Sequence, residues 1–102
     1  MAADPRRETA PATRERTELA PRYRVIIHND DVTPMFFVVQ VLGSIFHLEK
    51  PLAENVMLEA HNSGVAHVVT LSLEEAEVRC ERAHGLARTH GYPLTFTYEP
   101  DV

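Results

Sequence analysis

The sequence contains a single cysteine, Cys80, among its 102 residues. One cysteine excludes an internal disulfide bond and a zinc site built from several cysteines. The chain also lacks any apolar run near the roughly 20 residues that a helix needs to cross a bilayer. Its first residues include Asp4 and Glu8 and no apolar stretch, so we expect no secretory signal. Together these absences predict a protein of the cytoplasm, a reducing compartment.

Positive charge is scarce outside the N-terminal segment. Residues 1–24 hold six arginines and four acidic side chains, a net charge of +2, whereas the whole chain carries −5. Residues 25–102 therefore carry −7. Binding to nucleic acid depends on neutralising phosphates, so this acidic balance argues against a nucleic-acid partner and favours attraction of a cationic group.

One domain is expected, preceded by an unstructured segment. Residues 1–20 contain two prolines and many small or charged residues but no aromatic side chain, which is typical of a disordered arm. Residues 21–102 then form a single domain, and the 102-residue chain is near the lower end of the sizes that fold comfortably without disulfides or metals.

The folded part alternates between strand and helix patterns. Segments rich in β-branched and aromatic residues predict three strands, at 23–28, 65–71 and 94–99. Apolar residues at helical spacing predict three helices, over 35–46, 52–60 and 76–87. The order β-α-α-β-α-β favours an α+β fold in which a three-stranded antiparallel sheet packs against three helices.

Local signals mark the ends of the helices. We expect Thr33 to be the N-cap of the first helix and Pro34 its first residue, where the missing N–H is harmless. Ser72 and Glu75 form a capping-box pattern, in which each side chain bonds the backbone amide of the other residue. Gly64 and Gly91 are placed to end the second and third helices.

The loop NDDVT, residues 29–33, is polar although the segments on both sides of it are apolar. The ordinary interpretation is an Asx turn, because Asn and Asp side chains commonly bond nearby amides and start helices. A calcium loop would need spaced acids, a glycine and a closing glutamate, none of which follows. A zinc site needs three or four suitably spaced ligands, and no two histidines are four residues apart. We therefore expect neither a metal nor a cofactor.

Asp30 and His61 could act as an acid and a base in catalysis. No nucleophile motif or phosphate-binding loop accompanies them. Cys80 lies on a narrow apolar face of the third helix, where a buried, unreactive thiol is expected. A small hydrolase remains an alternative, but a protein that is not an enzyme is the preferred interpretation.

Four segments resemble the ClpS adaptor family, whose members deliver proteins bearing N-degrons to a ring-shaped AAA+ protease. In chain order they are NDDVTPMFFVVQVL, NVMLEAHNSGVA, EEAE and YPL. The resemblance covers residues 23–99 and extends to the N-terminal arm, which the family needs for delivery. It implies a monomeric, non-enzymatic adaptor that serves a ClpA- or ClpC-type unfoldase working with the ClpP peptidase.

The resemblance also implies a site for the free α-amino group of the substrate. Asn29, Asp30 and His61 match the side chains that hold this group in the family. A protonated amine offers three donors, and these residues supply an amide oxygen, a carboxylate and a neutral imidazole nitrogen as acceptors. The charge-assisted bond to the carboxylate is the strongest of the three. Asp31 matches a second acid, to which we give a supporting role through its field or by capping the helix.

An apolar pocket for the first side chain of the substrate follows from the same resemblance. In the family this side chain is Leu, Phe, Tyr or Trp, and Met35 matches a residue that disfavours the β-branched Ile and Val. The matching wall residues are Thr33, Met35, Val38, Met57, Ala60 and Leu94. The family usually has a larger aliphatic residue at the position of Ala60, which implies a roomier pocket. A protein-interaction module of this fold without selectivity for N-degrons is the alternative.

Glu74 and Arg79 match family positions that contact the N-terminal domain of the unfoldase. Without the resemblance, they would be interpreted as a solvated helix face. On that face Glu75 and Arg79 would form an ordinary ion pair four residues apart, worth roughly a few tenths of a kcal/mol.

Overall fold

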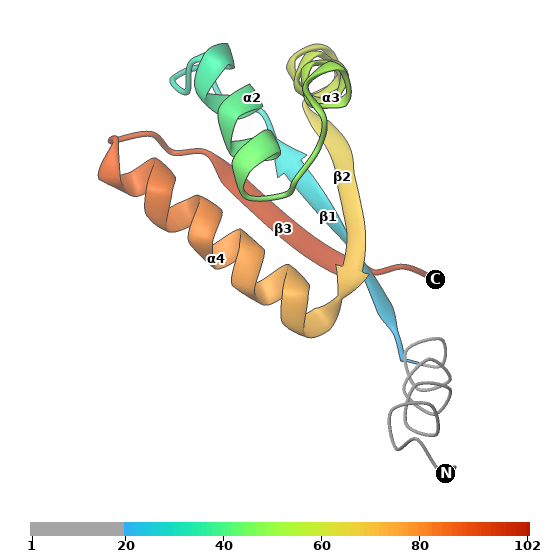
Figure 1. Cartoon of the computed structure of the whole chain (residues 1–102). Coiled ribbons are helices and arrows are strands. Elements are labelled where there is room, and N and C mark those ends of the chain that lie inside the picture. Colours follow the sequence, from blue (N-terminus) through green and yellow to red (C-terminus); the bar gives the residue numbers. More distant parts are fainter. Residues whose placement is uncertain (1–19) are drawn as a thin grey trace, which may run out of the picture.

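The computed structural model describes residues 20–102, in which three strands and three helices follow one another as β-α-α-β-α-β (Figure 1). The elements are β1 Arg22–His28, α2 Met35–Ser44, α3 Lys50–Ser63, β2 Val65–Ser72, α4 Leu73–Thr89 and β3 Thr95–Pro100. The α+β fold and its element order are thus confirmed. The disordered arm expected over residues 1–20 lies, apart from its last residue, outside the described part.

The sheet has β1 at its centre, in the order β2-β1-β3, with both pairs antiparallel. Ile27 faces Ala66 on β2 and Phe96 on β3. The register against β2 shifts after Val25, so that Val68 is an extra residue on that strand and forms a β-bulge.

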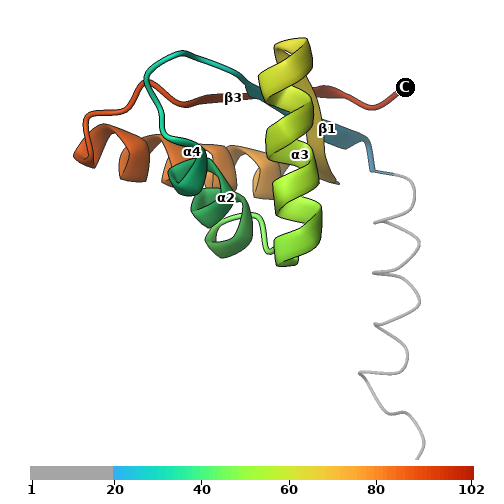
Figure 2. The same cartoon turned by 90° about the horizontal axis from the view of Figure 1, so that it is seen from above.

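One face of the sheet is covered by helices (Figure 2). The other face carries polar side chains. Val25 and Ile27 point to the covered face and are 0% and 1% exposed. Arg24 and His28 point to the opposite face, where Arg24 forms an ion pair with Glu99 and His28 Nε2 lies 2.7 Å from the Thr97 hydroxyl. This division is typical of antiparallel sheets.

Helix α4 lies along the sheet and contacts all three strands (Figure 1). Small side chains let it approach closely, and all four predicted for this face are buried: Ala76, Cys80, Ala83 and Ala87. Burial raises the pKa of the Cys80 thiol to about 11. The thiol therefore stays protonated at neutral pH, as expected of an unreactive cysteine.

His84 bonds the outer edge of the sheet. The Phe96 amide, on the side of β3 that faces away from β1, donates a 2.9 Å hydrogen bond to His84 Nε2. Burial, together with the positive charge of Arg88, lowers the pKa of His84. Both effects favour the neutral ring that this bond requires.

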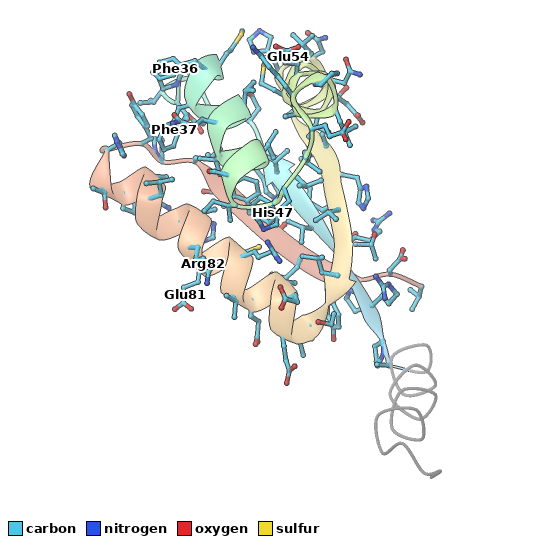
Figure 3. All side chains as sticks on the ribbon, viewed as in Figure 1. Phe36, Phe37, His47, Glu54, Glu81 and Arg82 are labelled. Carbon is cyan, nitrogen blue, oxygen red and sulfur yellow. The ribbon has the colours of Figure 1, made fainter. Side chains whose placement is uncertain are left out.

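Helices α2 and α3 pack against each other, and α3 also packs on β2 (Figure 2). Phe37 projects from α2 toward the segment that joins α4 to β3, where its ring centroid lies 4.8 Å from that of Tyr92 (Figure 3). The largest fully buried side chains of the core are Ile27, Leu42, Leu94, Val25 and Val41. In residues 20–102 no helix has the length and apolarity to cross a membrane.

The predicted limits of α2 are wrong at both ends. Pro34 is itself the N-cap, with ψ at 148°, and no side chain caps the helix. Thr33 lies before the N-cap and does not cap the helix; its hydroxyl donates to Asp30 Oδ2 at 2.9 Å. The helix ends at Ser44 rather than reaching Phe46, although Phe46 is still buried, against the ring of Phe96.

Two further predictions are corrected on the other helices. Ser72 Oγ accepts a 3.2 Å bond from the Glu75 amide as predicted, but the Glu75 carboxylate accepts from Arg79 Nε instead of reaching back. Leu52, expected on the apolar face of α3, is 49% exposed. The glycine stops are confirmed, since Gly64 has φ +92° and Gly91, just after α4, has φ +77°.

Candidate functional site

A pocket of about 420 Å³ opens between the loop before α2, the first turns of α2 and the second half of α3. It brings together all ten residues that the sequence assigned to the amine site, its support and the apolar pocket. They are Asn29, Asp30, Asp31, Thr33, Met35, Val38, Met57, Ala60, His61 and Leu94. Four lining residues were not assigned from the sequence, namely Ile27, His28, Val32 and Pro34. The volume is that of a site for a small ligand or a single side chain.

The loop is attached to the end of α3. The Asn29 amide nitrogen donates a 2.9 Å hydrogen bond to the Gly64 carbonyl oxygen. Gly64 ends α3 in the left-handed conformation and turns the chain into β2. His61 lies in the last turn of α3, so this bond places Asn29 and Asp30 at the same end of the pocket as His61.

The carboxylate of Asp30 organises the loop in the expected Asx turn. Its Oδ1 accepts from the amides of Val32, at 2.8 Å, and Thr33, at 2.7 Å, and its Oδ2 accepts from the Thr33 hydroxyl. A carboxylate oxygen can accept about two hydrogen bonds. Oδ1 is therefore fully used, whereas Oδ2 retains one acceptor position for a ligand.

The environment of Asp30 favours its charged form. Partial burial raises its pKa, but the hydrogen bonds from Thr33 and Val32 and the positive charge of Arg88 outweigh burial, and the net effect lowers the pKa. Asp30 is thus an anion at neutral pH, held in position by the loop before any ligand arrives.

The polar end of the pocket is suited to a cation. Asp30 and Asp31 supply two carboxylates, and the C-terminal end of α3 adds partial negative charge from its last carbonyl groups. Among the described residues, no lysine or arginine lines this pocket. Asp31 is exposed and does not cap α2, so the capping role suggested for it is wrong.

The other end of the pocket is apolar and rigid. Val38, Ala60 and Leu94 are buried, at 8%, 2% and 1% exposure, and belong to the main core. Met57 is half-buried, whereas Met35 is 45% exposed and borders the opening. A side chain that enters here meets fixed walls and two adaptable thioethers.

Neither a metal centre nor a nucleophile is found at this site. In the part of the chain that the structure describes, no three His, Cys, Asp or Glu side chains are placed to hold a metal ion. Thr33 supplies the one hydroxyl among the described lining residues, and its proton is donated to Asp30 rather than to a histidine. The Thr33 hydroxyl thus lacks the base partner that activates a nucleophilic hydroxyl.

Glu74 and Arg79 lie on α4, away from the pocket. Glu74 is exposed in the first turn. Arg79 is half-buried, and besides its ion pair with Glu75 it donates a 2.7 Å bond from Nη1 to the Ile45 carbonyl oxygen. Arg79 thus attaches the end of α2 to α4, a contact that no sequence pattern indicated.

Comparison with known proteins is consistent with this geometry. The family model for the ATP-dependent Clp protease adaptor protein ClpS matches residues 18–97. An ATP-dependent Clp protease adapter protein ClpS from Synechococcus sp. is 45% identical over 78% of this chain and 91% of its own length. One from Desulfatibacillum aliphaticivorans is 36% identical over 99% of this chain and 100% of its own length. The solved structure of Agrobacterium tumefaciens ClpS2 bound to L-phenylalaninamide superposes with a TM-score of 0.77. It is 38% identical and covers 79% of this chain and 98% of its own.

Proposed function

This chain belongs to the ClpS family of ATP-dependent Clp protease adaptor proteins, and we propose that it recognises proteins whose first residue is Leu, Phe, Tyr or Trp. In this proposal the α-ammonium group of the substrate is held by Asn29, Asp30 and His61, and Asp31 supports it through its charge. The first side chain enters the apolar end of the pocket. The adaptor itself carries out no reaction.

The observation that carries the proposal is the adjacency of two environments in one pocket. Asp30, with one acceptor position left on Oδ2, lies at the acidic end, and buried Val38 and Leu94 lie at the apolar end. Among natural peptide segments, only an N-terminal residue carries an ammonium group and a side chain on the same carbon atom. Burying a Leu or Phe side chain contributes roughly 1.5–3 kcal/mol, which alone gives weak binding, so both ends are needed.

The ligand of the A. tumefaciens relative has the same chemistry. L-Phenylalaninamide, bound to that protein, combines a free α-amino group with an aromatic side chain. Its carboxamide replaces the first peptide bond of a longer chain. A pocket that accepts this molecule has the features that we propose for the present chain.

Delivery is the second half of the proposal. We infer that the adaptor hands its substrate to a ClpA- or ClpC-type AAA+ unfoldase, in the cytoplasm and as a monomer. Exposed Glu74 and half-buried Arg79, both on α4, are the proposed contacts with the N-terminal domain of the unfoldase. Since Arg79 also bonds Ile45, Glu74 is the residue whose replacement tests this contact without disturbing the fold.

A pair of fluorescent peptides tests the recognition step. A peptide that begins with Leu is compared with its N-acetylated twin, which has the same side chain but no ammonium group. We expect fluorescence anisotropy to show binding of the free peptide and at least a tenfold weaker affinity for the acetylated one, because a bond to a charged group is worth about 1.5–3 kcal/mol. Equal affinities would favour an interaction module without N-degron selectivity.

A further inference from the structure

A second hollow adjoins the pocket at Val32. It has a volume of about 490 Å³ and is lined by Val32, Arg88, Gly91, Tyr92 and Pro93. Val32 also lines the pocket, so the two spaces share this one side chain as a wall. At 61% exposure, Val32 is among the most exposed large apolar side chains of residues 20–102. Val32 is therefore accessible to a ligand that extends from the pocket into the hollow.

The walls of this hollow are fixed by hydrogen bonds and packing. Arg88 Nη1 donates to the carbonyl oxygens of Tyr92, at 2.8 Å, and Leu94, at 3.1 Å, and the Tyr92 amide donates to the Ala87 carbonyl oxygen. The Tyr92 ring packs edge-on against Phe37. The segment that forms the hollow therefore also carries Leu94 into the pocket, and both spaces exist before a ligand binds.

The chemistry of the lining suits an aromatic ring. Val32 and Pro93 offer apolar surface, and Tyr92 offers an aromatic partner. Arg88 uses only Nη1 for its bonds to the main chain, which leaves the rest of its guanidinium group to face a bound ring. A flexible aliphatic side chain would gain only the first of these contacts.

The position of the hollow fits the third residue of a bound substrate. In an extended chain, alternate side chains point to the same side and lie roughly 6.5–7 Å apart. A substrate whose first side chain fills the pocket directs its third side chain to the same surface, about one side chain's width away. We propose that this hollow binds an aromatic side chain at the third position of the substrate, an inference that rests on the proposed function.

Three peptides with a common tail test the inference on the unaltered adaptor. They begin Leu-Ala-Ala, Leu-Ala-Phe and Leu-Phe-Ala, and binding is measured by fluorescence anisotropy. We expect Leu-Ala-Phe to bind roughly three- to tenfold more tightly than Leu-Ala-Ala, because the open hollow buries only part of the ring. An equal affinity of these two, or a larger gain for Leu-Phe-Ala, would overturn the assignment to the third residue. A fourth peptide with the same tail begins Leu-Ala-Glu, and a larger gain for it than for Leu-Ala-Phe would overturn the aromatic preference.

A variant separates this inference from the function on which it rests. Pro93 is exposed and lines the hollow but not the pocket, so Pro93→Ala should reduce the advantage of Leu-Ala-Phe at least twofold and leave Leu-Ala-Ala binding unchanged. Leu52→Ala, on the exposed side of α3, is the matched control and should keep the full advantage. Comparison of N-acetylated with free Leu-Ala-Ala measures amine recognition in the pocket without any contribution from the hollow. If the acetylated peptide binds as well as the free peptide, the proposed function fails, whereas a lost preference for Phe with intact amine recognition refutes only the hollow.

Discussion

The Asn29 amide nitrogen and the Gly64 carbonyl oxygen lie 2.9 Å apart in a hydrogen bond that joins the loop after β1 to the end of α3. Through this bond, the conformation of one glycine sets the position of two pocket residues on the loop, Asn29 and Asp30, relative to His61. The shape of the polar end of the pocket therefore depends on how α3 ends.

Replacing Gly64 by alanine tests this dependence. Gly64 has φ +92°, a conformation that costs an alanine roughly 1–2 kcal/mol, so Gly64→Ala should lower the free energy of unfolding by about that amount. Urea denaturation followed by circular dichroism measures the change. The affinity for a Leu-initiated peptide should fall as well, because the loop shifts with Gly64.

Gly85→Ala is the matched control. Gly85 lies inside α4, and a Cβ added there meets no atom within 4 Å. Alanine in a helix interior is favoured over glycine by about 0.5–1 kcal/mol, so this variant should be slightly more stable and bind peptide normally. Equal stability of Gly64→Ala and the parent protein would contradict the role given to the left-handed turn.

Asp30 holds the loop through its hydrogen bonds and, in the proposed function, binds the ammonium group of the substrate. Substitutions can separate these two functions. Asp30→Asn keeps an oxygen that can accept from the Val32 and Thr33 amides but removes the negative charge. We expect nearly normal stability and at least a tenfold loss of affinity for a free N-terminal peptide, measured by anisotropy. Asp30→Ala should lose the same affinity and, in addition, about 1–3 kcal/mol of stability, since both amides lose their acceptor. If Asp30→Asn bound normally, the carboxylate would be structural only.

Replacing Ala60 tests whether pocket size sets the choice of side chain. Ala60 is 2% exposed in the pocket wall, so Ala60→Val adds two methyl groups to the space that the ligand enters. Peptides that begin with Trp should lose several-fold more affinity than peptides that begin with Leu. Leu52→Val, on the exposed side of the same helix, should change neither affinity. A uniform loss for both peptides would indicate distortion of α3 rather than selection by size.

The stability of the domain should depend on pH through His84. Its pKa is lowered in the folded state by burial and by Arg88, and the Phe96 amide bonds its neutral ring. The unfolded chain therefore binds the proton more readily, so stability is complete above about pH 6.5 and decreases as the pH falls from there through the lowered folded value. Urea titrations between pH 8 and pH 5 measure this slope. His84→Gln should flatten it, and an unchanged slope in this variant would contradict the role given to His84.

The sequence predicted those parts of the site that depend on residue type at fixed spacing. The period of the apolar residues placed Val38 in the core, and the NDD loop predicted the Asx turn that Asp30 makes. The grouping of His61 and Leu94 with this loop came from the family resemblance, since no periodicity relates residues that far apart.

Contacts between a side chain and a distant backbone group could not be predicted in this way. The bonds from Arg79 to Ile45 and from Phe96 to His84 depend on how α4 is placed against α2 and β3. Thr33 shows the same limit at short range. A Thr hydroxyl can accept from a helix amide or donate to a carboxylate; the sequence pattern indicated the first, whereas the structure shows the second, to the charged Asp30.

The bond between Phe96 and His84 also limits how molecules of this protein can associate. By alternation, the backbone amide positions of Phe96, Tyr98 and Pro100 point away from β1, to the outer side of β3. The Phe96 amide is bonded to His84, and Pro100 has no amide hydrogen. A strand from another molecule would find one free amide donor in this row, that of Tyr98, which makes this edge a poor template for sheet extension, the risk that exposed sheet edges carry.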